Sequence, residues 1–97
     1  MPYAKRIVLN CPRGYRVELD ALVERFIQDR VAFVAVVGED CAEVESIIDG
    51  LIVGEGSDTG RYILTSSHPG KSVGDAIAFA NSLTGDMCVD EVQVVEL

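Results

Sequence analysis

Seven consecutive apolar residues, Val31-Ala32-Phe33-Val34-Ala35-Val36-Val37, constrain this chain more than any other part of its sequence. The run is far shorter than the roughly 20 residues that a membrane-spanning helix needs. It also lacks the polar alternation of a strand with one face in water, so it predicts a strand that is covered on both faces. Strands of this kind occur in parallel sheets between layers of helices, and we therefore expect an α/β fold.

Strand and helix patterns alternate along the rest of the chain. Short runs rich in β-branched residues predict three further strands, at residues 5–10, 61–65 and 91–97. Apolar residues at helical spacing predict three helices, at residues 17–30, 40–54 and 72–85. The polar, glycine-rich residues 54–60 predict a loop.

Two of these helices begin at the spacing of a capping box. Asp40 stands three residues before Glu43, and Ser72 stands three residues before Asp75. A side-chain oxygen at the first position can accept a hydrogen bond from the backbone of the residue three positions on, and the acidic side chain can accept one in return. The second and third helices are therefore predicted to start at these residues.

The alternation predicts one domain over residues 1–97, with three layers in the order βαβαβαβ and a mainly parallel four-stranded sheet of the Rossmann or flavodoxin type. We expect the strand order 2-1-3-4, and the sense of the last strand stays open. Right-handed crossovers then put the first helix on one face and the other two on the opposite face, which leaves one face undercovered. This order places the apolar second strand at an edge, so either that strand is interior or the chain self-associates. We expect a homodimer.

Charge and cysteine content limit the partners and the compartment. Sixteen acidic residues against eight basic ones give a net charge of −8, which opposes binding to nucleic acid and to anionic membranes. The amino-terminal residues show no secretory signal, so we expect a cytoplasmic protein. The three cysteines are an odd number without paired spacing, which suits reduced thiols better than disulfides, and no spacing predicts a metal site or a cofactor.

The turn after the third predicted strand is the strongest candidate for a ligand site. Hydroxyl groups, a lysine and the free amides of a helix N-terminus can together hold an anion. Gly70-Lys71-Ser72 resembles the end of a phosphate-binding P-loop, but Thr65 stands where that motif has its first glycine and Pro69 removes an amide. A capped turn without a ligand is the competing interpretation. The candidate ligand residues are Ser66, Ser67, His68, Gly70, Lys71 and Ser72, with Arg13 or Arg16 assisting.

Cys11 follows the first predicted strand and precedes a helix, a place where the helix dipole can lower the pKa of a thiol. Cys11-Pro12 faintly resembles a thioredoxin-like redox site with one cysteine, although Gly14 stands where the second cysteine would be. A small buried thiol is the competing interpretation. His68 could act with Cys11 or Cys41 as a base or a metal ligand, whereas a solvent-exposed imidazole is the alternative.

Two function classes remain open on the sequence alone. The first is a non-enzymatic protein-interaction or regulatory module that self-associates, because it accounts for the apolar content and the acidic charge without any catalytic group. The second is a domain that binds, or acts on, a small anionic or phosphate-containing ligand at the carboxyl edge of the sheet, around Ser66–Ser72. The fold by itself does not choose between these classes.

Overall fold

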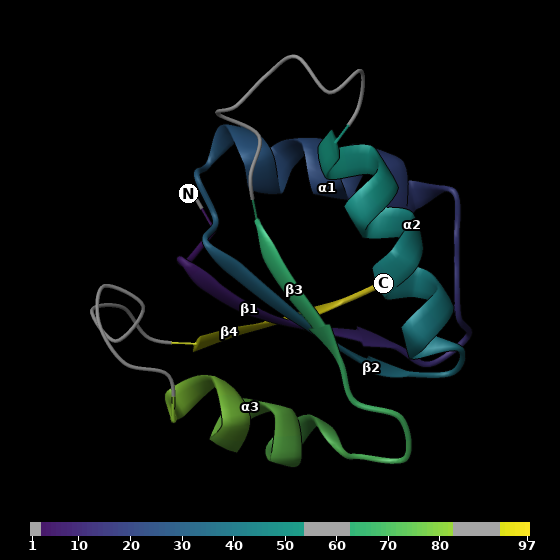
Figure 1. Cartoon of the computed structure of the whole chain (residues 1–97), viewed down its shortest axis with the longest axis vertical. Helices are drawn as coiled ribbons and strands as arrows, with labels where there is room; N and C mark the ends of the chain where they lie inside the picture. The colour runs from purple at the N-terminus through teal and green to yellow at the C-terminus, as the bar shows by residue number, and fades with distance from the viewer. Residues whose placement is uncertain (1–2, 54–62, 83–91) are drawn as a thin grey trace.

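The computed structural model describes residues 3–53, 63–82 and 92–97 of the chain (Figure 1). Its four strands are β1 (Arg6–Cys11), β2 (Phe33–Gly38), β3 (Leu64–Ser67) and β4 (Val92–Glu96). Its three helices are α1 (Glu18–Gln28), α2 (Cys41–Val53) and α3 (Val73–Asn81). The predicted alternation of strands and helices is therefore confirmed. The predicted loop at residues 54–60, the end of the third helix near Gly85, and Cys88 lie outside the described residues.

The four strands form one fully parallel sheet in the order β3-β2-β1-β4. The α/β class and the parallel sheet are as predicted, but the predicted order 2-1-3-4 is wrong. The apolar strand β2 lies inside the sheet, where neighbours on both sides satisfy its backbone and its side chains are buried. Because β2 is not an exposed edge strand, it gives no reason to expect a dimer.

The strand order also changes which helices share a face. From β1 to β2 to β3 the chain moves in one direction, so right-handed crossovers put α1 and α2 on the same face. The return from β3 to β4 reverses the direction, and among the described helices it puts only α3 on the other face (Figure 1). The expectation that the second and third helices share a face is wrong. The described elements leave the face with α3 undercovered, and Leu64, Phe79 and Val94 on it are each about two-fifths exposed.

The larger part of the core lies between the sheet and the pair α1 and α2. Alternate side chains of β1 and β2 point to this face, where Leu19, Val23 and Phe26 of α1 and Val44 and Ile48 of α2 pack on them. All five of these helix residues are fully buried. They fall at the spacing of one helix face in the sequence, which is why the helices could be predicted.

A smaller core lies under α3. Ala76 and Ala80 pack there against Val8, Phe33, Ala35 and Val37, and the small alanine side chains let the helix approach the sheet closely. At the far end of this layer, the guanidinium of the buried residue Arg6 donates a hydrogen bond of 3.0 Å to the carbonyl oxygen of Ala80. A cation at a helix C-terminus opposes the negative end of the helix dipole. Arg6 therefore fixes the end of α3 to the start of β1.

The carbonyl oxygen of Cys11 ties two loops together where β1 ends. It accepts hydrogen bonds from the backbone N–H of Gly14 at 3.1 Å and of Glu39 at 2.9 Å. Gly38 is the register partner of Cys11, and a Cβ atom at Gly38 would lie 2.4 Å from that carbonyl oxygen. Gly38 also has a φ of +109°, which side chains rarely adopt. Only glycine fits here, so the residue sets how closely β1 and β2 approach.

Several predicted boundaries shift in the structure. The third strand extends further than predicted, so Ser66 and Ser67 belong to β3 and only His68 to Lys71 form the turn. The capping box of Ser72 and Asp75 is confirmed. Asp40 has a φ of +51° instead of the extended backbone of an N-cap, because the chain turns sharply between Gly38 and α2.

A glycine-to-alanine pair tests the close approach of β1 and β2. Gly38→Ala is expected to lower the free energy of unfolding by about 3 kcal/mol or more, since its Cβ would overlap the backbone of Cys11. Gly50→Ala is the matched control, because nothing lies within 4 Å of a Cβ at this position in α2. The control is expected to raise stability by about 0.5–1 kcal/mol. Urea denaturation measures both, and equal stability of the two variants would contradict the packing described.

Candidate groove at the carboxyl edge of the sheet

The strand order separates the turn after β3 from the chain segments at the carboxyl ends of β1 and β4. In open parallel sheets, ligands bind beyond the carboxyl ends of the strands, at the point where the direction of strand addition reverses. In the order β3-β2-β1-β4 this point lies between β1 and β4. The loop after β1 and the end of β4 therefore flank the expected position of a ligand, whereas the turn after β3 lies at the opposite side of the sheet.

An open groove of about 460 Å³ lies beside this point, between α1 and the end of β4. This volume falls within the range of small-molecule sites. Ala21, Leu22 and Leu97 supply its apolar surface, and its charged residues are Arg16, Glu18, Arg25 and Glu96.

The wall of the groove comes from one side of α1. Glu18, Leu22 and Arg25 are spaced by four and three residues, so they follow one another along a single helix face. Leu97 on the opposite wall is fixed by its backbone N–H, which donates a hydrogen bond of 2.9 Å to the carbonyl oxygen of Asn10 in β1. The groove therefore has walls held by a helix and by the sheet.

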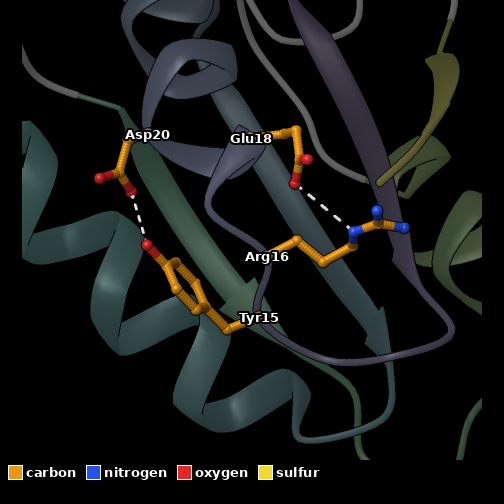
Figure 2. Close-up of polar contacts among 4 residues, drawn as sticks. All are labelled: Tyr15, Arg16, Glu18 and Asp20. Carbon is orange, nitrogen blue, oxygen red and sulfur yellow. Dashed lines mark hydrogen bonds and ion pairs between the residues drawn. The ribbon is translucent and has the colours of Figure 1, made fainter.

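The loop before α1 is held by two polar contacts (Figure 2). Arg16 forms an ion pair with Glu18, at 3.4 Å between Nε and a carboxylate oxygen. Tyr15 donates a hydrogen bond of 3.1 Å to Asp20, and this bond is the main reason that the pKa of Tyr15 is raised. Figure 2 shows the two pairs on different sides of the loop. Only the Arg16 pair lines the groove, so a ligand anion would compete with Glu18 for this guanidinium.

Arg25 differs from Arg16 in its surroundings. Within residues 3–53, 63–82 and 92–97, Arg16 and Glu18 form the one ion pair. The guanidinium of Arg25 therefore lies in the groove without a carboxylate partner among the described residues. A guanidinium presents several donors in a planar fork, which matches the two oxygens of a carboxylate or phosphate. The groove thus combines apolar surface with a cation that is available for a ligand.

The predicted anion site after β3 has different chemistry. Ser66 and His68 contact each other, with 2.8 Å between Oγ and Nε2, and the imidazole packs on Phe79 at 4.7 Å between ring centres. Lys71 and Gly70 are exposed. Thr65 and Ser67 point to the other face of the sheet, because side chains alternate along the strand. The turn therefore gathers Ser66 and His68 but separates them from Ser67.

The N-terminus of α3 already holds a carboxylate. Ser72 Oγ accepts a hydrogen bond from the Asp75 backbone, and the Asp75 carboxylate accepts one from the Ser72 backbone, both at 3.1 Å. The bond from the Ser72 backbone is the main reason that the pKa of Asp75 lies below its usual value. A bound anion would face this ionised group, which opposes the predicted anion site. Arg13 is exposed in the loop after β1, and β2 separates this loop from the turn.

Cys11 is a buried thiol instead of an activated one. Burial, followed by the nearby Cys41 thiol, raises the pKa of Cys11 to about 11. Both cysteines are free and belong to the core under α1 and α2. The helix-dipole argument for a low pKa at this position does not hold, because the side chain points into the core and away from solvent.

The ligand class is not indicated by metal-binding groups among the described residues or by known relatives. The described part of the chain contains no group of three or more His, Cys, Asp or Glu side chains that could hold a metal ion. None of its described helices is both long enough and apolar enough to cross a membrane. Known protein families, curated proteins and solved structures were compared with the chain, and none of them matches it.

Sequence patterns pointed to this edge of the sheet, but to the turn after β3 and not to the groove between α1 and β4. Arg16 was a candidate for assisting anion binding, whereas Arg25, Glu96 and Leu97 were not candidates. The helical spacing of Glu18, Leu22 and Arg25 was present in the sequence. These residues line a groove only because β4 lies next to β1, and no local pattern specifies that pairing.

Thiol labelling tests the assignment of Cys11 as a core residue. At pH 7.5 a maleimide reagent is expected to label Cys11 far more slowly than a cysteine in an unfolded peptide, because a pKa of about 11 leaves almost no thiolate. The variant Cys41→Ala with Cys88→Ala isolates this thiol, and peptide mass spectrometry measures the rate. In urea the rate is expected to rise to the unfolded value. Labelling of the folded variant as fast as the unfolded control would contradict this assignment.

Proposed function

We propose that this chain is a binding domain that holds, in the groove between α1 and β4, a ligand with an apolar body and a carboxylate or phosphate group. The observation that carries the proposal is the position of Arg25 beside the apolar Leu22 and Leu97, in a groove next to the reversal point of the sheet. In this arrangement the apolar part contacts the leucines and the anionic group pairs with the guanidinium.

The charge of the protein supports this ligand class over a polyanion. With a net charge of −8 the chain repels nucleic acid, yet one local cation can still bind a single anionic group at short range. The proposal retains an anionic ligand at the carboxyl edge of the sheet. It places that ligand at the groove and away from Ser66–Ser72, where Asp75 already neutralises the helix end.

A protein-interaction module that self-associates is the second candidate function. The exposed side chain of Val94 on the edge strand β4 favours it, since an apolar residue on an unpaired strand edge promotes association. The two candidates centre on different parts of β4. The groove lies against its carboxyl end, whereas Val94 lies at the middle of the strand on the other face.

Octanoate is a suitable probe of the groove because it combines a carboxylate with a short apolar chain. At ten times its dissociation constant it is expected to stabilise the protein by about 1.4 kcal/mol, seen as a rise in melting temperature. Acetate, which has the carboxylate but not the chain, is expected to give no measurable shift at the same concentration. Arg25→Gln is expected to weaken octanoate binding about tenfold or more, since it removes a charge-assisted hydrogen bond.

Three further variants locate the site. Glu18→Gln is expected to tighten octanoate binding, because it releases Arg16 from its internal ion pair. Lys71→Ala and Arg13→Gln each remove one exposed cation elsewhere and are expected to leave binding unchanged. Isothermal titration calorimetry measures all four variants. If phosphate or octanoate binding survived in Arg25→Gln and vanished in Lys71→Ala, the ligand would belong to the turn after β3 and the proposed groove would be wrong.

A further inference from the structure

The outer edge of β4 is not paired with any other described strand. Backbone groups of alternate residues in a strand point to opposite sides. The N–H of Leu97 donates to Asn10 of β1, so Val95 and Gln93 also direct their backbone groups to β1. Val92, Val94 and Glu96 therefore direct theirs outward, and among the described strands none lies beyond β4. Such an edge is a template for one more strand.

We propose that the added strand is β4 of a second copy, paired antiparallel about a two-fold axis at Val94. In antiparallel pairs, residues that exchange backbone hydrogen bonds face one another. Pairing Val94 with its own counterpart also pairs Val92 with Glu96 of the other copy, so every outward-pointing residue of β4 finds a partner. The two sheets then join into one continuous sheet.

The side chains at this edge fit a two-fold arrangement. Val94 is 41% exposed, and on pairing it would pack against the Val94 side chain of the second copy. On the opposite face, Gln93 and Val95 would lie across from one another. Glu96 is the one charged residue of the described strand β4, and it would not meet a like charge, because it faces Val92 of the second copy. An interface that contacts itself across a two-fold axis must be complementary to itself in this way.

Charge complementarity favours a second copy over another partner. Arg6 and Val92 are neighbours in the sheet, on the face covered by α3. In the proposed pairing the Glu96 side chain of the second copy lies in the same row on that face, with its backbone about 10 Å from that of Arg6, two strand spacings away. Arg6 is only 5% exposed, and its Nε has no hydrogen-bond partner among the described residues. The symmetry forms this charge pair twice.

The expected association is weak. A single pair of short strands buries less area than a stable dimer interface, and each copy carries a net charge of −8, which adds repulsion. We therefore expect a concentration-dependent dimer with a micromolar dissociation constant. Sedimentation equilibrium measures this constant, and a purely monomeric protein at millimolar concentration would overturn the proposal.

Two substitutions of valine by lysine locate the interface. Val94→Lys is expected to weaken dimerisation at least tenfold, because it places a charge at the two-fold axis on a strand edge. Val17→Lys is the matched control, since it makes the same change at a side chain that is 74% exposed and lies before α1. Its dimerisation constant is expected to stay within twofold of that of the unmodified chain. Equal effects of the two changes would overturn the assignment to β4.

A proline variant tests the same interface in case the lysine variant does not fold. Val94→Pro removes a backbone N–H that points outward and takes no part in the pairing with β1. It is expected to leave the circular dichroism spectrum unchanged while weakening dimerisation at least tenfold. A folded proline variant that dimerises as well as the unmodified chain would overturn the proposal.

Charge reversal at Glu96 tests the proposed pair with Arg6. Glu96→Lys reduces the net negative charge of each copy, so it would strengthen association if only overall repulsion mattered. The proposed pair predicts the opposite result, at least a tenfold loss. Glu39→Lys makes the same charge change at an exposed position after β2 and is expected to strengthen association or leave it unchanged. Strengthening of the dimer by both substitutions would overturn the proposed register.

Discussion

Strand β1 is paired on both sides, and this double pairing determines the rest of the structure. It lies between β2 and β4, which are far apart in the sequence, and it lies parallel to both. The carbonyl oxygen of Cys11 at its end accepts hydrogen bonds from the loops before α1 and before α2. Because β4 joins the sheet beside β1, the direction of strand addition reverses there, and the groove forms next to that point.

The placement of β4 also explains why the two proposals concern one strand. An edge strand has one side of its backbone unpaired, which suits a second copy, and its carboxyl end lies open beside α1, which suits a small ligand. The dimer would use Val94 at the middle of the strand, and the ligand would use Leu97 at its end. Glu96 belongs to both surfaces, so ligand binding and association are expected to influence one another.

The elements of this fold follow from local sequence patterns. The run Val31–Val37 predicted a fully buried strand, and β2 is buried on both faces. The stripe of Leu19, Val23 and Phe26 predicted the buried face of α1. Ser72 and Asp75 predicted the start of α3 through side-chain hydrogen bonds that span three residues. Interactions within a helix turn or along a strand produce periodic patterns in the sequence. Such patterns can be recognised without knowing which elements are neighbours in the fold.

No local sequence pattern specifies the strand order or the groove. The order 2-1-3-4 and the observed order use the same strands, the same helices and the same crossover handedness, so local patterns do not distinguish them. Arg25 could be placed on a helix but not opposite Leu97 across a groove, because that arrangement depends on which strand lies next to β1. Cys11 was considered as a reactive thiol because it stands between a strand and a helix, but its side chain lies in the core.

The most direct test of the central claim is a nuclear magnetic resonance titration of the isotope-labelled chain with octanoate, which records the backbone amide shifts of all residues except the prolines. If the reversal point between β1 and β4 positions the ligand site, the largest shift changes will fall on Leu22, Arg25 and Leu97. The amides of His68 to Asp75 will then stay unchanged. Changes concentrated on His68 to Asp75, with none along α1, would contradict the account.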